Sequence, residues 1–170
     1  MAKRVSLKEF QEGLASRLKA AATEAAPSAR LGFEAGGTNW LARLESSGEV
    51  LQVPEIQRVP LTRDWFLGVA NIRGALFGVS DFGAFLGAAP TARGPENRLL
   101  LVGQPHGVNC ALLVSRLTGL RNVVEYVPEP GTASADWVAG TWRDKEERVW
   151  REIDTGRLLS NRGFLEIAVH

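Results

Sequence analysis

The sequence predicts a mainly β fold made of short antiparallel strands, and two observations lead to it. Glycine accounts for 18 of the 170 residues, above the average share of roughly 7%. Along most of the chain, short apolar runs alternate with turn signals rich in glycine and proline. Because chains of this kind protect their sheet edges by curling, we expect small barrels or sandwiches with a few short helices.

The first segment, residues 1–30, differs from the rest. Ser6 stands three residues before Glu9, which is the spacing of a capping box. Apolar residues then recur at helical intervals, namely Leu7, Phe10, Leu14 and Leu18. This pattern predicts a helix over 7–25 that packs on the body or is offered to a partner; a frayed leader is the alternative. The second unit is residues 31–170.

Two strand signals follow the leader. Residues 31–44 are typical of a strand, a turn at Gly36-Gly37 and a second strand. Residues 49–61 contain Pro54 and Pro60, which favour an edge strand or a connector over a central strand.

Residues 68–82 form an apolar run with glycines and a single charged arginine, Arg73, in the middle. The run predicts two strands joined at Arg73-Gly74. An unpaired charge is costly to bury, so Arg73 should lie at a surface or have a partner. Residues 81–90 then predict one or two helical turns, and 91–97 a loop.

The remaining elements are a series of short strands. Residues 98–120 predict a hairpin that turns at 104–107, and 123–137 a strand followed by a loop. The charged segment 141–154 allows a solvated helix, but flanking glycines favour a hairpin with its turn at 144–147. After it, Asp154 is placed to cap a short helix through Leu158 and Leu159, and the alternation of 163–169 predicts a closing strand.

Composition excludes several classes of function. With 20 basic and 19 acidic side chains, the net charge is +1, so we expect neither a nucleic-acid partner nor binding to anionic membranes. The N-terminus has no apolar region typical of a signal peptide, and no run is long enough to cross a bilayer. We therefore expect a soluble, cytoplasmic protein. We also expect its lone cysteine, Cys110, to be a core residue.

Most catalytic machinery is missing. The chain has two histidines and one cysteine, which makes a zinc site implausible. It has no phosphate-binding glycine loop and no nucleophile elbow. We therefore expect no enzyme activity, no cofactor and no metal, although an enzyme that uses only Asp or Glu stays open.

Residues 68–82 resemble the most recognisable segment of the CheW family of chemosensory adaptors. That family carries a G-V-x-N-[LI]-R-G motif followed by a strand that ends in an acidic residue. The matching positions here are Gly68, Val69, Asn71, Ile72, Arg73, Gly74, Val79 and Asp81. The likeness extends over about residues 31–168. The leader, Ala70 and the 163–169 ending are most similar to the subgroup that serves type IV pilus (twitching-motility) systems.

The resemblance implies two five-stranded β-barrel lobes around a shared core and no catalytic activity. It also implies two partners: the cytoplasmic tip of a methyl-accepting chemoreceptor and the regulatory domain of a CheA-type histidine kinase. Candidate partner-binding residues are Asn71, Ile72, Arg73, Gly74, Val50, Leu99, Leu100 and Trp65. We expect Asn71 and Gly74 to hold the turn that aims Arg73, and Trp65 to be partly exposed.

Several alternatives stay open from the sequence. Arg73 could instead pair with a local acid such as Asp81 and brace the two lobes. Val50, Leu99 and Leu100 could be core residues, as apolar strand residues usually are. A different function, a small-molecule or peptide-binding β-barrel unrelated to kinases, would show an enclosed apolar pocket with convergent polar groups.

Overall fold

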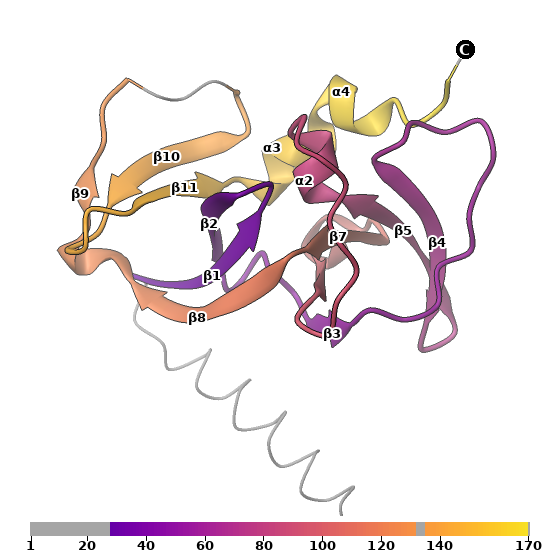
Figure 1. Ribbon diagram of the computed structural model, residues 1–170, viewed down its shortest axis with the longest axis horizontal. Coiled ribbons are helices and arrows are strands. Elements are labelled where there is room, and N and C mark those ends of the chain that lie inside the picture. Colours follow the sequence, from indigo (N-terminus) through magenta and orange to yellow (C-terminus); the bar gives the residue numbers. More distant parts are fainter. Residues whose placement is uncertain (1–27, 132–134, 170) are drawn as a thin grey trace, which may run out of the picture.

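The computed structural model describes residues 28–131 and 135–169, and these form two β-sheets with short helices between and beside them (Figure 1). The helix expected over 7–25 lies outside the described residues. The strands are β1 (Ala29–Ala35), β2 (Thr38–Arg43), β3 (Val50–Gln52), β4 (Phe66–Ile72), β5 (Ala75–Asp81), β6 (Arg98–Leu101), β7 (Cys110–Val114), β8 (Arg116–Asn122), β9 (Val127–Pro128), β10 (Val138–Arg143) and β11 (Val149–Ile153). The α-helices are α2 (Phe82–Phe85), α3 (Thr155–Ser160) and α4 (Arg162–Leu165), and the 3₁₀ turns are η1 (Gln104–His106) and η2 (Val123–Glu125).

The prediction of a mainly β chain with two sheets is confirmed, with differences in detail. One sheet has six strands, in the order β8-β1-β2-β11-β10-β9, and the other has five, in the order β3-β6-β7-β5-β4. Neither order closes into a full barrel. The expectation of purely antiparallel pairing is wrong, because β5 pairs with β7 and β2 with β11 in parallel. Both parallel pairs join strands with other elements between them in the chain, which leaves room for the crossover that parallel pairing needs.

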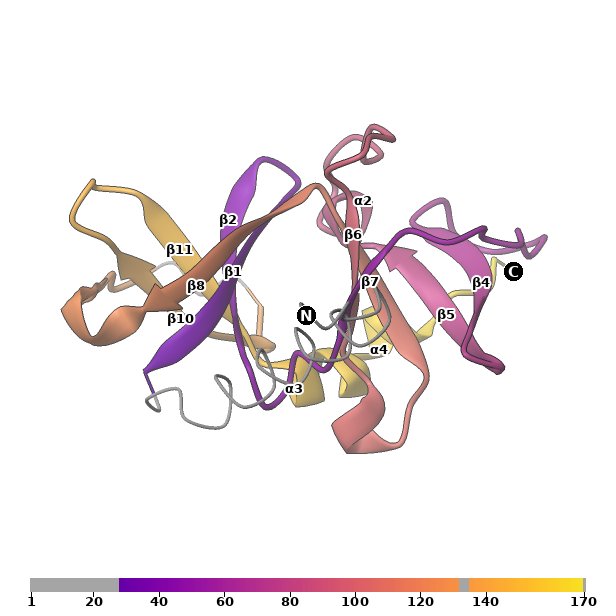
Figure 2. The same cartoon turned by 90° about the horizontal axis from the view of Figure 1, so that it is seen from below.

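A shared hydrophobic core joins the two sheets, as expected. It contains Trp40 from β2, Phe82 from α2, Leu100 and Leu112 from the five-stranded sheet, and Leu158 from α3. Figures 1 and 2 place α2 and α3 between the sheets. A second cluster, which includes Phe77, Val79 and Leu99, lies within the five-stranded sheet alone. Cys110 belongs to the shared core, and burial raises the pKa of its thiol to about 12.

The strongest turn signals gave hairpins where they were predicted. β1 and β2 are joined at Gly36-Gly37, and β4 and β5 at Arg73-Gly74. The charged segment 141–154 is a hairpin, with Trp142 facing Trp150, and the solvated-helix alternative is wrong. The side chain of Asp154 accepts a hydrogen bond from the Arg157 amide and caps α3, as expected.

The segment 98–120 was predicted to be one hairpin, but the hairpin ends at Val114. At Ser115, whose amide donates to the Glu34 carbonyl, the chain leaves the five-stranded sheet. It continues as β8, which pairs with β1 in the other sheet. In the next segment, 123–137, the strand has only the two residues of β9. Val123–Glu125 form a 3₁₀ turn instead, which the Asn122 side chain caps.

The closing strand predicted over 163–169 is wrong, because residues Arg162–Leu165 form α4. The Asn161 side chain caps α4 through the Phe164 amide. Phe164 is buried against Trp65 and Phe85, a contact that helical geometry allows and the alternation of the sequence did not reveal. Only Ala168 forms a β-bridge, to Thr62.

The turn between β10 and β11 is organised by a buried carboxylate. Asp144 accepts hydrogen bonds from the amides of Glu146 and Arg148, from the Arg148 Nε at 2.8 Å and from the Trp150 indole at 2.9 Å. Burial by itself raises the pKa of this carboxyl. The hydrogen bonds from Trp150 and Arg148 outweigh it and hold the pKa of Asp144 below its ordinary value.

We predict that Asp144→Asn lowers the free energy of unfolding at pH 7 by at least about 2 kcal/mol, because charge-assisted hydrogen bonds to a buried acceptor are lost. The pKa of Asp144 is lower in the folded chain, so its contribution is complete above the unfolded value of about 3.9. It disappears as the pH falls through the folded value. Urea titrations should therefore show the gap between the two proteins narrowing below about pH 4. A gap of equal size at pH 7 and at low pH would contradict this account.

Candidate protein-interaction site

The turn between β4 and β5, residues 71–74, presents the arginine of the sequence motif. Ile72 faces Ala75 across the hairpin, so Arg73 and Gly74 are its two central residues. Their φ angles are +53° and +83°, as in a type I′ turn. The Asn71 side chain accepts a hydrogen bond from the Gly74 amide at 2.9 Å. The expectation that Asn71 and Gly74 hold this turn is confirmed.

Arg73 occupies a backbone conformation that suits glycine and asparagine far better than arginine. Its side chain is 70% exposed, so burial of the side chain does not offset the unfavourable φ. Non-glycine residues in such conformations are concentrated at functional sites. The turn therefore favours a role for the Arg73 guanidinium outside the fold's own stability.

The guanidinium of Arg73 binds both carboxylate oxygens of Glu49, with Nη1 at 2.5 Å from Oε2 and Nη2 in contact with Oε1. The hydrogen bonds and the charge of Glu49 raise the pKa of Arg73, which therefore stays charged. The alternative in which Arg73 pairs with an acid of its own chain is therefore confirmed in part: the acid is Glu49 and not Asp81, and the pair lies beside the five-stranded sheet instead of bracing the two lobes. The Asp81 carboxylate instead caps α2 through the Ala84 amide and binds the Thr91 amide and hydroxyl.

The Arg73–Glu49 pair connects opposite edges of the five-stranded sheet. Glu49 immediately precedes β3 at one edge, and Arg73 follows β4 at the other. Nearby, Gln57 and Val69 exchange two backbone hydrogen bonds, which link the segment after β3 to β4. Gly68 makes this approach possible, because a Cβ there would collide with the Gln57 carbonyl. The β4–β5 hairpin is thus held to the segment around β3 by two contacts, the Arg73–Glu49 ion pair and the Gln57–Val69 hydrogen bonds.

An apolar side chain accompanies Arg73 on the exposed part of this hairpin. Leu76, opposite Asn71 in the register, is 63% exposed. Sequence reasoning did not identify it. The signal was available, because Phe77 and Val79 face inward and strand alternation then places Leu76 outward. A charged group and an exposed leucine on the same hairpin are a combination that a protein partner can recognise.

The other candidate residues differ in how far their side chains are exposed. Ile72 is buried, and Val50 is half-buried against the shared core. Leu99 and Leu100 are completely buried. Leu100 packs in the shared core and Leu99 in the second cluster, with their apolar side chains covered by the chain itself. The prediction that Leu99 and Leu100 bind a partner is therefore wrong, and both belong to the core.

Trp65 is partly exposed, as predicted, and it also has a structural role. Its ring stacks on Phe164 at 5.7 Å between centroids and meets the edge of Phe85 at 5.2 Å. These contacts attach α4 to the loop before β4. Trp65 lies in this aromatic cluster and not in the Arg73 turn.

The exposed groups of this site, the Arg73 guanidinium and the Leu76 side chain, support recognition through charge and apolar contact. In the described part of the chain, no cluster of three or more His, Cys, Asp or Glu residues is arranged to hold a metal ion. None of the helices within the described ranges is long and apolar enough to cross a membrane.

Comparisons with known proteins agree with the fold. The model of the CheW-like domain matches residues 30–163. The chain is similar to Protein PilI of Pseudomonas aeruginosa, with 29% identity over 144 residues that span 82% of this chain and 79% of that protein. It is also similar to the crystal structure of the scaffolding protein TtCheW from Thermoanaerobacter tengcongensis. That likeness has a TM-score of 0.65 and 19% identity, over 75% of this chain and 84% of the other, and it supports the fold alone.

We predict that Gly74→Ala and Arg73→Asn affect stability in different ways. Nothing lies within 4 Å of the Cβ that alanine would add at Gly74, so the cost of about 1 kcal/mol comes from the positive φ alone. Asparagine tolerates the left-handed conformation, so Arg73→Asn should leave the melting temperature unchanged or raise it, despite the lost contact with Glu49. Thermal unfolding of both variants checks this. A marked fall in the melting temperature of Arg73→Asn would make Arg73 a structural residue.

Proposed function

Because the chain belongs to the family of CheW-like domains, whose members are non-catalytic scaffolding adaptors, we propose that it couples a chemoreceptor to a CheA-type histidine kinase. In this proposal one surface binds the cytoplasmic tip of the receptor and another binds the regulatory domain of the kinase. The adaptor works in the cytoplasm, in receptor arrays that it joins through its partners. The likeness to PilI supports a chemotaxis-like system that controls twitching motility by type IV pili.

The Arg73 turn is the observation that carries this proposal. Its guanidinium is exposed, charged and paired with Glu49, and the Asn71–Gly74 hydrogen bond holds the turn that carries it. A planar guanidinium can bind a carboxylate or backbone carbonyls in a defined geometry. The exposed Leu76 beside it supplies apolar area. Such an arrangement suits an interface in which arginine fixes the register and an apolar neighbour adds affinity.

The adaptor acts through binding alone. A receptor that changes conformation alters kinase activity only if the assembly binds the two receptor states with different free energies. The hydrogen-bonded turn serves this purpose, because it presents Arg73 from a defined backbone position. No proton or group transfer by this chain is required.

The Arg73 turn can be tested by calorimetric titration with the regulatory domain of a CheA-type kinase from the same genome. We expect micromolar binding by the unmodified protein and a loss of about tenfold or more for Arg73→Glu. Arg162→Glu is the matched control, because it reverses the charge of another exposed arginine that is paired with a glutamate. It should bind like the unmodified protein.

The double variant Glu49→Arg, Arg73→Glu separates the contact role from the structural role. It restores the ion pair with its polarity reversed. If Arg73 binds the partner directly, the double variant stays as weak as Arg73→Glu. If the pair only holds the turn, binding returns. Unchanged binding by Arg73→Glu would show that Arg73 is not part of the surface that binds the kinase. Absence of binding to any such kinase would overturn the proposed coupling.

A further inference from the structure

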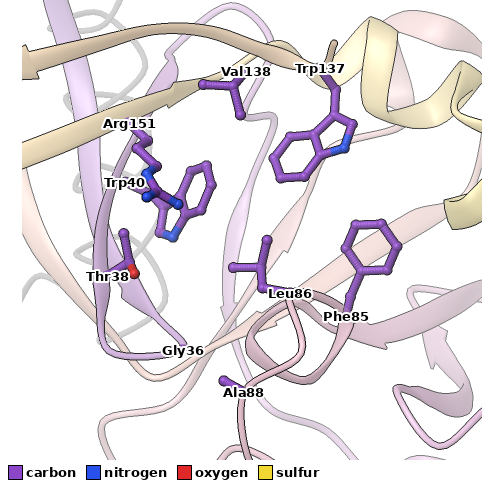
Figure 3. A pocket seen from close by; sticks show the side chains of 9 residues that line it. All are labelled: Gly36, Thr38, Trp40, Phe85, Leu86, Ala88, Trp137, Val138 and Arg151. Atoms are coloured by element: carbon purple, nitrogen blue, oxygen red, sulfur yellow. The ribbon is translucent and has the colours of Figure 1, made fainter. Parts of the chain in front are cut away.

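A cavity of about 320 Å³ lies where the six-stranded sheet meets α2, away from the Arg73 turn. Figure 3 shows Trp40, Arg151 and Thr38 on one side of it and Trp137, Leu86 and Phe85 on the other. Most of the lining residues are aromatic or aliphatic, and the two polar side chains among them, Arg151 and Thr38, lie on one side. This distribution is typical of a site for a small molecule with one polar end.

The indole Nε1 of Trp40 is a buried donor without an acceptor. Trp40 is completely buried, and among residues 28–131 and 135–169 its Nε1–H reaches no hydrogen-bond partner. Buried polar groups in native proteins are almost always paired, so an exception calls for a missing partner such as a ligand or a water molecule. Since Trp40 lines the cavity, that partner can be something the cavity holds.

Two other tryptophans of the same sheet identify the chemistry of the missing partner. The Trp150 indole donates to the Asp144 carboxylate at 2.9 Å, and Arg148 binds the same carboxylate. The Trp142 indole donates to Glu152 at 3.2 Å, and both Arg30 and Arg43 bind that carboxylate. In both cases an indole N–H and a guanidinium hold one carboxylate together.

Trp40 has the same pair of donors around it but no carboxylate. The Arg151 guanidinium carbon lies over the Trp40 ring, 5.9 Å from its centre, and Figure 3 shows both side chains on the same side of the cavity. Arg148 lies over the Trp150 ring in the same way, at 5.8 Å. Within the described residues Arg151 forms no ion pair and no hydrogen bond through its side chain. We propose that this cavity binds a small organic acid, with its carboxylate between Trp40 and Arg151 and its apolar part against Trp137, Leu86 and Phe85.

The size of the cavity limits the ligand. A water molecule occupies about 30 Å³ in the liquid, so a cavity of 320 Å³ corresponds to roughly ten waters. An arylacetate with a single ring is of matching size, and its ring can stack on the aromatic wall. Phenylacetate is therefore a suitable probe, and phenylacetamide is its neutral counterpart of the same shape.

The test uses the indole N–H signals of the full chain, labelled with ¹⁵N. Five tryptophans give five such signals, and the one absent from Trp40→Phe belongs to Trp40. Phenylacetate should move this signal downfield in a saturable way, with a Kd of about 1 mM or tighter. Phenylacetamide should bind at least about tenfold more weakly, because it lacks the charge that Arg151 pairs with. If Trp40→Phe does not fold, sequential assignment of the unmodified protein identifies the same signal.

Arg151→Gln should weaken phenylacetate binding by about tenfold. Arg116→Gln is the matched control, because Arg116 is an exposed arginine that does not line the cavity and pairs with Glu34; it should bind like the unmodified protein. A Trp40 signal that does not move with phenylacetate would mean that the cavity holds water only and would overturn the proposal. Equal binding of phenylacetamide, or equal binding by Arg151→Gln, would overturn it as well. The result is independent of kinase binding, so this proposal and the adaptor proposal can fail separately.

Discussion

The burial of Phe82 between the two sheets is the contact on which the rest of the molecule depends. Its ring lies 5.0 Å from Trp40, 6.2 Å from Phe33 and 5.9 Å from Trp137, all measured between centroids. Phe33 and Trp40 belong to the six-stranded sheet, whereas Phe82 directly follows β5 of the five-stranded sheet. Aromatic rings contribute large buried areas and prefer such tilted or edge-on contacts. Phe82 thereby forms the centre of the aromatic contacts in the shared core that joins two otherwise small and marginal sheets.

Asp81 fixes the position of Phe82. Its carboxylate caps the first turn of α2 and binds Thr91 through both the amide and the hydroxyl. Hydrogen bonds from Ala84 and from Thr91 therefore hold the turn that places Phe82 in the core. With the core secured there, the far end of the same β4–β5 hairpin can carry an unfavourable backbone conformation at Arg73. Stability and recognition are separated along one hairpin, with the acid at one end and the arginine at the other.

The sequence predicted best those elements that short-range signals determine. The Gly36-Gly37 and Arg73-Gly74 turns, the hairpin over 141–154 and the Asp154 cap all follow from residues within a few positions of one another. The errors concern contacts between distant segments. Nothing near Arg73 in the sequence pointed to Glu49, which approaches only because the sheet curls. Likewise, the alternation of apolar residues over 163–169 could not reveal that Phe164 packs against Trp65 and Phe85. The burial of both Leu99 and Leu100 depends on packing on both faces of β6, and the three consecutive leucines of this strand give no alternation from which to infer it.

Arginine side chains bind carboxylates in two ways in this molecule, and the difference follows from the burial of the carboxylate. In the six-stranded sheet, Asp144 and Glu152 are buried, and each is satisfied by an indole together with one or two guanidinium groups. A buried carboxylate needs several donors, because it has lost its hydration. Next to the five-stranded sheet, Glu49 keeps part of its solvent contact, and Arg73 is its single arginine partner within the described residues. Such a partner can be exchanged, because water and a second carboxylate can replace Glu49 at little cost. The buried carboxylates are therefore suited to holding the fold rigid, whereas the exposed Glu49–Arg73 pair is suited to exchanging one carboxylate for another.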